Sequence, residues 1–255
     1  MSELSTPRFR NRPRNQSPKL RILDQSSLDS TFAEAYRTLR SNIVLGNGDR
    51  SLKSIAVTSA SHAEGRTTTV LNLGIVTARA GPRVVIVEAD FRRPTMKDVM
   101  TELARVSPEL LHPGGLSSVV AGSVALQDAL WPTRFDRLSV IPAGRSKCHP
   151  TELLSSKRMR CVLAELSEAA DQVIFDTPPC LAYADALLLA NLVDGVVHVV
   201  RAGSRNKEAQ PQAQKHLRHA GARMLGVVVN DIAAADITKY GYRRGDRHGR
   251  EAARS

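Results

Sequence analysis

Residues 60–69 (ASHAEGRTTT) constrain the fold of this chain more than any other segment. They come close to the pattern G-x-x-x-x-G-K-[ST], in which backbone N–H groups and a lysine surround phosphates and a hydroxyl binds Mg²⁺. Gly65 and Thr67 match this pattern, whereas Ala60 and Arg66 depart from it. Taken alone, the loop is open to a second interpretation, a glycine-containing turn before a helix.

The segments on either side of the loop favour the phosphate-binding interpretation. Residues 54–58 (SIAVT) are apolar and β-branched, as in a strand buried in a parallel sheet. Residues 67–80 place apolar side chains at helical spacing, and Gly81 supplies a stop. A strand, a tight loop and a helix N-terminus bind anions through free N–H groups and the helix dipole. We therefore expect a phosphate site here.

An alternation of strand and helix patterns continues to residue 230, which is typical of a parallel sheet with helices on both faces. The sequence predicts an α/β fold: a doubly wound, mainly parallel sheet in three layers, as in P-loop NTPases. The expected strands are 54–58, 83–88, 138–141, 172–175, 195–200 and 225–229. The expected helices run from 29 or 30 to about 45, then over 67–80, 151–155 continuing into 158–169, 184–191 and 207–219. Residues 96–135 are interrupted by glycine and proline, so only short elements are expected there.

The net charge of +11 is concentrated at the two ends of the chain. Residues 1–23 carry a net +5 (6 − 1) and residues 239–255 a net +4 (6 − 2), which is 9 of the 11 excess charges. Such segments indicate disordered tails that attract anionic surfaces, and they hold no element that reads a nucleic-acid sequence. We expect a basic tail over 1–28, one domain over 29–232 and a second basic tail over 233–255.

Several classes of protein are disfavoured by composition. No apolar run approaches the ~20 residues of a membrane span, and the N-terminus lacks the apolar stretch of a secretory signal. The three cysteines show no CxxC spacing, which argues against a zinc site or a disulfide framework. A cytoplasmic protein is therefore expected.

Two further strand ends carry carboxylates where a nucleotide site needs them. Residues 84–90 (VVIVEAD) end in Glu88 and Asp90, and residues 172–179 (QVIFDTPP) place Asp176 after an apolar strand. Ligands of doubly wound sheets collect at the carboxyl ends of the strands, where acids can share the Mg²⁺ of a phosphate loop. The alternatives are a solvated strand end for the first pair and a capped turn for Asp176.

At these motifs the chain resembles the bacterial tyrosine kinases that regulate capsule and exopolysaccharide export, which are relatives of the partition and cell-division positioning ATPases. The resemblance spans about residues 30–232. It is carried by residues 88–94 (EADFRRP), 175–179 (FDTPP), 185–186 (DA), 192–195 (LVDG), 199–203 (VVRAG) and 225–230 (LGVVVN).

The resemblance implies a protein-tyrosine kinase that uses ATP and Mg²⁺ and regulates polysaccharide polymerisation and export. It assigns catalysis to Arg66, Glu88, Asp90 and Asp176. It assigns Mg²⁺ binding to Thr67, Asp90 and Asp176. It assigns nucleotide binding to Ala60, Ala63, Glu64, Gly65, Arg66, Thr67, Thr68 and, at the adenine, Asn230.

The resemblance also implies partners. In the N-terminal helix, Glu34, Arg37 and Arg40 form the E-x-x-R-x-x-R motif that the family uses for ring-like self-association, although an ion pair within the helix is the alternative for Glu34 and Arg37. The expected phosphorylation sites are Tyr240 and Tyr242. Family members act beside an inner-membrane chain-length protein, here expected as a separate polypeptide that holds the kinase at the inner face of the cell membrane.

Three departures from the family fall at the chemistry. Arg66 replaces the lysine, Glu88 replaces the first aspartate of an acidic pair, and Ala63 stands where glycine is common, so a positive φ there would be strained. An inactive nucleotide-binding scaffold of the same export machinery is therefore the alternative to a kinase. A positioning-type ATPase fits less well, because Ser61 fills the place of that group's second lysine.

Overall fold

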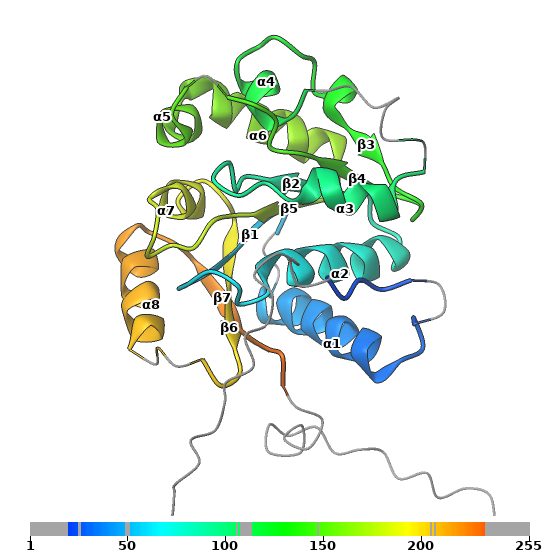
Figure 1. Cartoon of the computed structure of the whole chain (residues 1–255), viewed down its shortest axis with the longest axis vertical. Coiled ribbons are helices and arrows are strands. Elements are labelled where there is room, and N and C mark those ends of the chain that lie inside the picture. Colours follow the sequence, from blue (N-terminus) through cyan, green and yellow to red (C-terminus); the bar gives the residue numbers. More distant parts are fainter. Residues whose placement is uncertain are drawn as a thin grey trace, which may run out of the picture.

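The computed structural model describes residues 20–24, 27–48, 52–105, 107, 114–146, 148–204, 206 and 208–232. These residues form a seven-stranded sheet with helices on both sides (Figure 1). The strands are β1 (Ser54–Ser59), β2 (Val84–Glu88), β3 (Trp131–Pro132), β4 (Leu138–Ile141), β5 (Gln172–Asp176), β6 (Gly195–Arg201) and β7 (Met224–Asn230). Their order is β3-β4-β2-β5-β1-β6-β7, and every neighbouring pair is parallel except β3 and β4. The predicted mainly parallel α/β sheet is confirmed.

The helices form the two outer layers. They are α1 (Thr31–Gly46), α2 (Arg66–Arg79), α3 (Met96–Leu103), α4 (Leu116–Val120), α5 (Pro150–Ser155), α6 (Lys157–Ala169), α7 (Asp185–Ala190) and α8 (Ala209–His219). Buried side chains of α1, α2 and α3 share one apolar cluster, and those of α4 to α8 share a second. Figure 1 shows α1 against α2 on one side of the sheet, with α7 and α8 on the other.

The position of the central strand follows from its sequence. All six residues of β1 are buried, because β1 lies between β5 and β6 and is covered on both faces. Helix α2 approaches the sheet closely at Gly74, where a Cβ would meet Cδ1 of Ile86 at 2.7 Å. The phosphate-loop segment thus joins the middle of the sheet to its most buried helix.

A segment before the first helix also packs on α2. The side chain of Asn72, buried in α2, accepts a hydrogen bond from the N–H of Leu23 (2.8 Å) and donates one to the carbonyl of Arg21 (2.9 Å). Leu23 is fully buried. Residues 20–24 are therefore part of the packed structure, whereas the expected limits of the domain stay predictions.

The predicted elements match the structure closely except between residues 96 and 135. Each of the six expected strands is present, and Ser156 separates α5 from α6, capping α6 by accepting from the N–H of Met159 (3.1 Å). The elements α3, α4 and β3 were not individually predicted. Nevertheless α3 carries a helical stripe of buried residues: Met96, Val99, Met100 and Leu103. The glycines and prolines nearby hid that periodicity.

Some predictions lie outside the described residues. These are the two tails beyond residues 20 and 232, with Tyr240 and Tyr242. Within the described part of the chain, no helix combines the length and the apolar character that crossing a membrane requires.

Candidate nucleotide site

The loop between β1 and α2 exposes the start of a helix. Gly65 adopts φ 96° in the left-handed region, and no side chain caps α2. A Cβ at Gly65 would lie 1.8 Å from Nδ2 of Asn230, so only glycine fits beneath that side chain. The first N–H groups of a helix have no partner within it, so those of α2, which no side chain caps, suit an anion.

Ala63 has φ 60°, the positive value that the sequence analysis identified as strained for a residue with a Cβ. The left-handed region costs such a residue roughly 1 kcal/mol. The backbone is therefore left-handed on both sides of Glu64, and the strain lies at Ala63, because glycine adopts the positive φ of Gly65 freely.

Arg66 lies inside the loop, with 8% of its surface exposed. Its Nη1 donates to Oγ of Ser59 (2.7 Å) and to the carbonyl of Ser61 (3.1 Å). Its Nη2 forms an ion pair with Oδ2 of Asp90 at 3.3 Å. The planar guanidinium thus joins the end of β1 to the carboxylate that follows β2, a geometry that the single ammonium of lysine cannot reproduce.

Thr67 and Asp176 form the second contact between the loop and a strand end. The Thr67 hydroxyl donates to Oδ2 of Asp176 at 2.7 Å, while Oδ1 of Asp176 is buried and has no hydrogen-bond partner among the described residues. Burial raises the pKa of Asp176 to about 6, opposed by the charge of Arg66 and the bond from Thr67. A buried carboxylate oxygen without a donor beside a threonine hydroxyl suits a hard cation.

Asp90 is also buried, and both of its carboxylate oxygens are occupied. Oδ1 accepts from the N–H groups of Arg92 (3.2 Å) and Arg93 (3.0 Å), and Oδ2 faces Arg66. The described residues contain no group of three or more His, Cys, Asp or Glu arranged for a metal. Mg²⁺ in phosphate sites needs only one or two carboxylates, because phosphates and water supply its other ligands.

Glu88 has a different set of partners. Its Oε1 accepts from the N–H groups of Thr95 and Met96 (2.8 Å to Met96), and its Oε2 accepts from the N–H of Ala143 (2.9 Å). Burial raises the pKa of Glu88 to about 7, although these backbone bonds oppose the rise. The structure therefore brings Arg66, Asp90 and the Thr67–Asp176 pair together, and it uses Glu88 to hold the start of α3. A catalytic role for Glu88 stays a prediction.

Asn230, at the end of β7, reaches the loop from the opposite side. Its Nδ2 donates to the carbonyl of Glu64 at 3.1 Å. The side chain is thus placed at the phosphate loop; whether it contacts adenine stays a prediction.

Sequence reasoning missed a cluster beside Asp90. Arg92 pairs with the buried Asp185 (Nε to Oδ2, 3.0 Å), and its guanidinium lies 4.8 Å from the centre of the Tyr183 ring. The ring of His62, in the loop, meets the Tyr183 ring edge-on at 6.1 Å. The family-like residues 185–186 were the available signal, but their partner Arg92 is 93 residues away.

Two of the three residues expected to mediate self-association, Glu34 and Arg37, pair within their own helix. Glu34 and Arg37 form an exposed ion pair at 3.0 Å, and Arg37 also donates to the carbonyl of Leu28 (2.6 Å). Nε of Arg40 is buried and has no hydrogen-bond partner in the part of the chain that the structure describes. The intrahelical alternative is thus present, and ring-like self-association stays a prediction.

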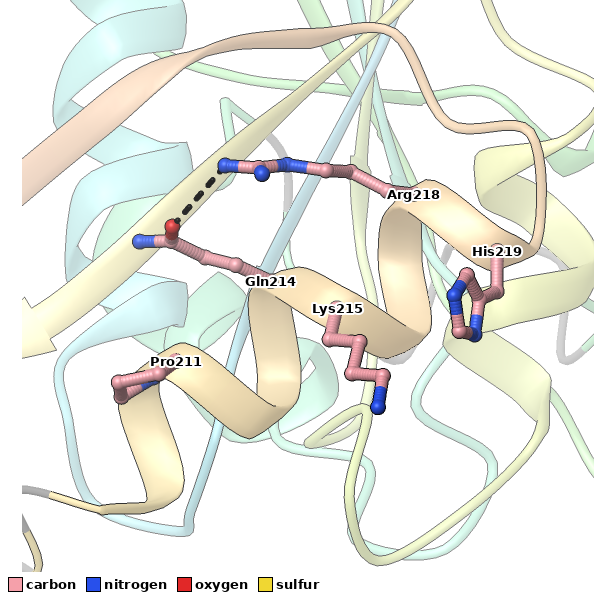
Figure 2. Close-up of a pocket in the computed structure, with 5 residues that line it drawn as sticks. All are labelled: Pro211, Gln214, Lys215, Arg218 and His219. Carbon is pink, nitrogen blue, oxygen red and sulfur yellow. Dashed lines mark hydrogen bonds between the residues drawn. The ribbon is translucent and has the colours of Figure 1, made fainter.

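A surface hollow of about 330 Å³ lies apart from this chemistry. It is lined by residues of α8, namely Pro211, Gln214, Lys215, Arg218 and His219 (Figure 2). None of the strand-end carboxylates contributes to it, so the candidate site is the loop and its surroundings.

Comparison with known proteins agrees with this geometry. Residues 52–202 match a family described as an AAA domain. Tyrosine-protein kinase YwqD of Bacillus subtilis is 36% identical over 229 residues, which cover 90% of this chain and 92% of that protein. Tyrosine-protein kinase CpsD of Streptococcus pneumoniae is 33% identical over 208 residues, covering 82% of this chain and 87% of that protein.

Solved structures show the same relationship. The crystal structure of the chimerical protein CapA2B2 is similar with a TM-score of 0.74 and 31% identity, over 83% of this chain and 92% of that chain. The kinase domain of the Escherichia coli tyrosine kinase ETK gives 0.73 and 27%, over 88% and 85%. The septum site-determining protein MinD of Pyrococcus horikoshii, complexed with Mg-ADP, gives 0.57 and 20%, over 73% and 76%, and shows a shared fold.

Proposed function

We propose that this chain binds Mg-ATP and transfers a phosphoryl group to tyrosine hydroxyls, because it belongs to the bacterial tyrosine kinases, which have a P-loop ATPase fold. The observation that carries the proposal is the Thr67–Asp176 hydrogen bond of 2.7 Å at the uncapped start of α2. It brings a hydroxyl and a buried carboxylate to the place where the helix N-terminus attracts phosphates.

The nucleotide would lie along the loop. The residues that would hold it are Ala60, Ala63, Glu64, Gly65, Arg66, Thr67 and Thr68, with Asn230 at the adenine. Backbone N–H groups of this segment suit the phosphates, because α2 has no side-chain cap to compete for them. Arg66 supplies the positive charge that lysine supplies in the usual pattern.

The same geometry fits Mg²⁺. Thr67, Asp90 and Asp176 would hold the ion, and Oδ1 of Asp176 is the buried acceptor that lacks a hydrogen-bond partner among the described residues. When bound, Mg²⁺ neutralises charge that develops on the phosphates. Asp90 would then divide its carboxylate between the cation and Arg66.

Phosphoryl transfer depends mainly on positioning and charge stabilisation, so the group that orients the tyrosine hydroxyl matters most. Glu88 and Asp90 both follow β2, but Glu88 already accepts three backbone hydrogen bonds, at Thr95, Met96 and Ala143. Asp90 lies beside Arg66 and is the better placed of the two. We assign the orienting role to Asp90 and a supporting role to Glu88.

The biological setting follows from the family. The proposed role is control of capsule or exopolysaccharide polymerisation and export, together with a separate chain-length protein of the inner membrane. The proposed location is the cytoplasmic face of that membrane, in a ring-like homo-oligomer formed through Glu34, Arg37 and Arg40. The basic tails would attract anionic surfaces, and the proposed phosphorylation sites are Tyr240 and Tyr242.

The test is transfer of labelled phosphate from ATP to the purified chain in the presence of Mg²⁺. Phosphotyrosine should form, and it should be lost in Asp176→Ala and in a chain that ends before Tyr240. A wild-type chain that binds Mg-ADP but forms no phosphotyrosine beside its membrane partner would contradict the kinase and support the scaffold. The Arg66–Asp90 ion pair is the observation in favour of the scaffold, because each of the two charged side chains is already paired with the other.

A further inference from the structure

Three side chains from distant parts of the sequence form a hydrogen-bonded chain behind the phosphate loop. Nε2 of His198, in β6, lies 2.7 Å from Oε1 of Gln210, in α8. Nε2 of Gln210 donates to Oε1 of Glu64, in the loop, at 3.0 Å. His198 is fully buried and Glu64 is 3% exposed, so neither group exchanges these bonds with bulk water.

The chemistry of the three groups sets the direction of each bond. The amide nitrogen of Gln210 donates to the carboxyl oxygen of Glu64, so its amide oxygen faces His198 and can only accept. His198 therefore donates from Nε2–H, and in a neutral ring Nδ1 then carries no proton. Burial lowers the pKa of His198, which agrees with a neutral ring. Gln210 thus accepts a hydrogen bond from the histidine through its amide oxygen and donates one to the carboxylate through its amide nitrogen.

This series of hydrogen bonds ends at Glu64 on one side of Gln210 and at His198 on the other. Oε2 of Glu64 and Nδ1 of His198 are buried and have no hydrogen-bond partner among the described residues. Gln210 therefore supplies the one side-chain hydrogen bond that the structure records for each of these two groups. Removing it would leave a carboxylate and an imidazole buried and unsatisfied, which is costly.

Glu64 is also held through its main chain, since its carbonyl accepts from Asn230. It stands between Ala63 and Gly65, which both have positive φ. A strained backbone persists only where its surroundings fix it from more than one direction. Gln210 fixes the side chain of Glu64 and Asn230 fixes its carbonyl, and together they hold the curve of the loop.

We propose that Gln210 and His198 are positioning residues of the phosphate loop, acting through Glu64 to keep its N–H groups directed at a bound phosphate. This inference rests on the proposed function in that a nucleotide is the ligand. Neither residue belongs to the loop: His198 lies in β6, and Gln210 lies in α8, whose buried residues join a different apolar cluster from those of α2.

The test compares Gln210→Leu with Gln214→Leu. Gln214 lies one turn further along the same helix and contacts Arg218 at 3.5 Å (Figure 2), so it is a matched control. Gln210→Leu should weaken Mg-ADP binding roughly tenfold, and it should speed amide hydrogen exchange over residues 60–66 in the nucleotide-free chain. Gln214→Leu should change neither measurement.

Two more variants keep the test decisive. Glu64→Gln retains an acceptor for Gln210, so amide hydrogen exchange over residues 60–66 should stay as slow as in the wild type. Gln210→Asn keeps a polar side chain but withdraws the amide by one methylene, so it should shift binding and exchange in the same direction as the leucine variant. It serves in place of Gln210→Leu if that protein does not fold.

The outcomes separate this inference from the proposed function. If Gln210→Leu and Gln210→Asn lower the melting temperature but leave Mg-ADP affinity and loop exchange at wild-type values, the residues are merely structural and the inference is wrong. If the wild-type chain does not bind Mg-ADP, the nucleotide proposal fails. The exchange comparison still decides whether Gln210 positions the loop.

Discussion

The hydroxyl of Thr67 donates to the carboxylate of Asp176 across 109 residues of sequence, at 2.7 Å. The bond joins the first turn of α2 to the end of β5, which is adjacent to β1 in the sheet. One oxygen of Asp176 is thereby engaged, and the other is buried without a hydrogen-bond partner among the described residues. In the proposed function, this pair is where the loop and the sheet share one cation.

Removal of the Asp176 carboxylate should abolish this cation site. Asp176→Asn retains an acceptor for Thr67 but loses the charge, so Mg²⁺-dependent phosphotyrosine formation should fall by roughly 10²-fold or more. The check is the rate of phosphate transfer over a Mg²⁺ titration. Asp171→Asn is the matched control, because Asp171 is exposed and pairs with Arg83 instead. Equal rates of phosphate transfer for the two variants would show that Asp176 does not bind the metal.

Arg66→Lys should raise phosphate transfer by about tenfold. Lysine loses the fork that binds Ser59 and Asp90, so the Asp90 carboxylate becomes available to the cation and the acceptor. The measurement is kcat/KM for ATP, with Arg79→Lys in the last turn of the same helix as control. A lower kcat/KM in Arg66→Lys would show that this chain has adapted to arginine.

Glu88 should make stability depend on pH. Burial raises the pKa of Glu88 from 4.5 to about 7, so the folded chain holds this proton more tightly than the unfolded chain does. The contribution to stability is fully present below pH 4.5 and is lost as the pH rises through 7, at a cost of about 3 kcal/mol. Asp176, raised from 3.8 to about 6, contributes in the same direction at lower pH.

Urea unfolding without Mg²⁺ at several pH values between 4.5 and 8 measures this dependence. Glu88→Gln cannot ionise, so its free energy of unfolding should vary less with pH than that of the wild type. Parallel curves for the two proteins would mean that Glu88 is not the titrating group. Its three backbone hydrogen bonds would then keep it charged throughout.

Ala63→Gly should stabilise the chain. At φ 60° the alanine is strained by roughly 1 kcal/mol, and glycine removes that strain at a smaller cost in chain entropy. The expected gain is about 0.5 kcal/mol, seen as a higher melting temperature. Ala182→Gly is the control, since Ala182 is exposed and is not among the residues with positive φ. It should lower the melting temperature.

Local pattern was enough to predict most of the elements. The apolar runs that became β1, β2 and β5 carry their own signal, because strands buried on both faces need continuous apolar residues. The loop before α2 could likewise be predicted from the sequence, since a glycine before a helix and a threonine closely following that glycine are short-range features. The prediction that the strand-end carboxylates belong to the site followed from the rule that ligands gather where parallel strands end.

The sequence by itself therefore determined a parallel α/β sheet and a phosphate loop with carboxylates near it. Only the tertiary structure decided what each carboxylate does. Glu88 and Asp90 are two residues apart, yet Glu88 binds the N–H of Ala143, 55 residues away, whereas Asp90 pairs with Arg66. Glu64 likewise meets Gln210 at a separation of 146 residues. Hydrogen-bond partners of buried groups are chosen by which elements the sheet brings together, and no local pattern encodes that choice.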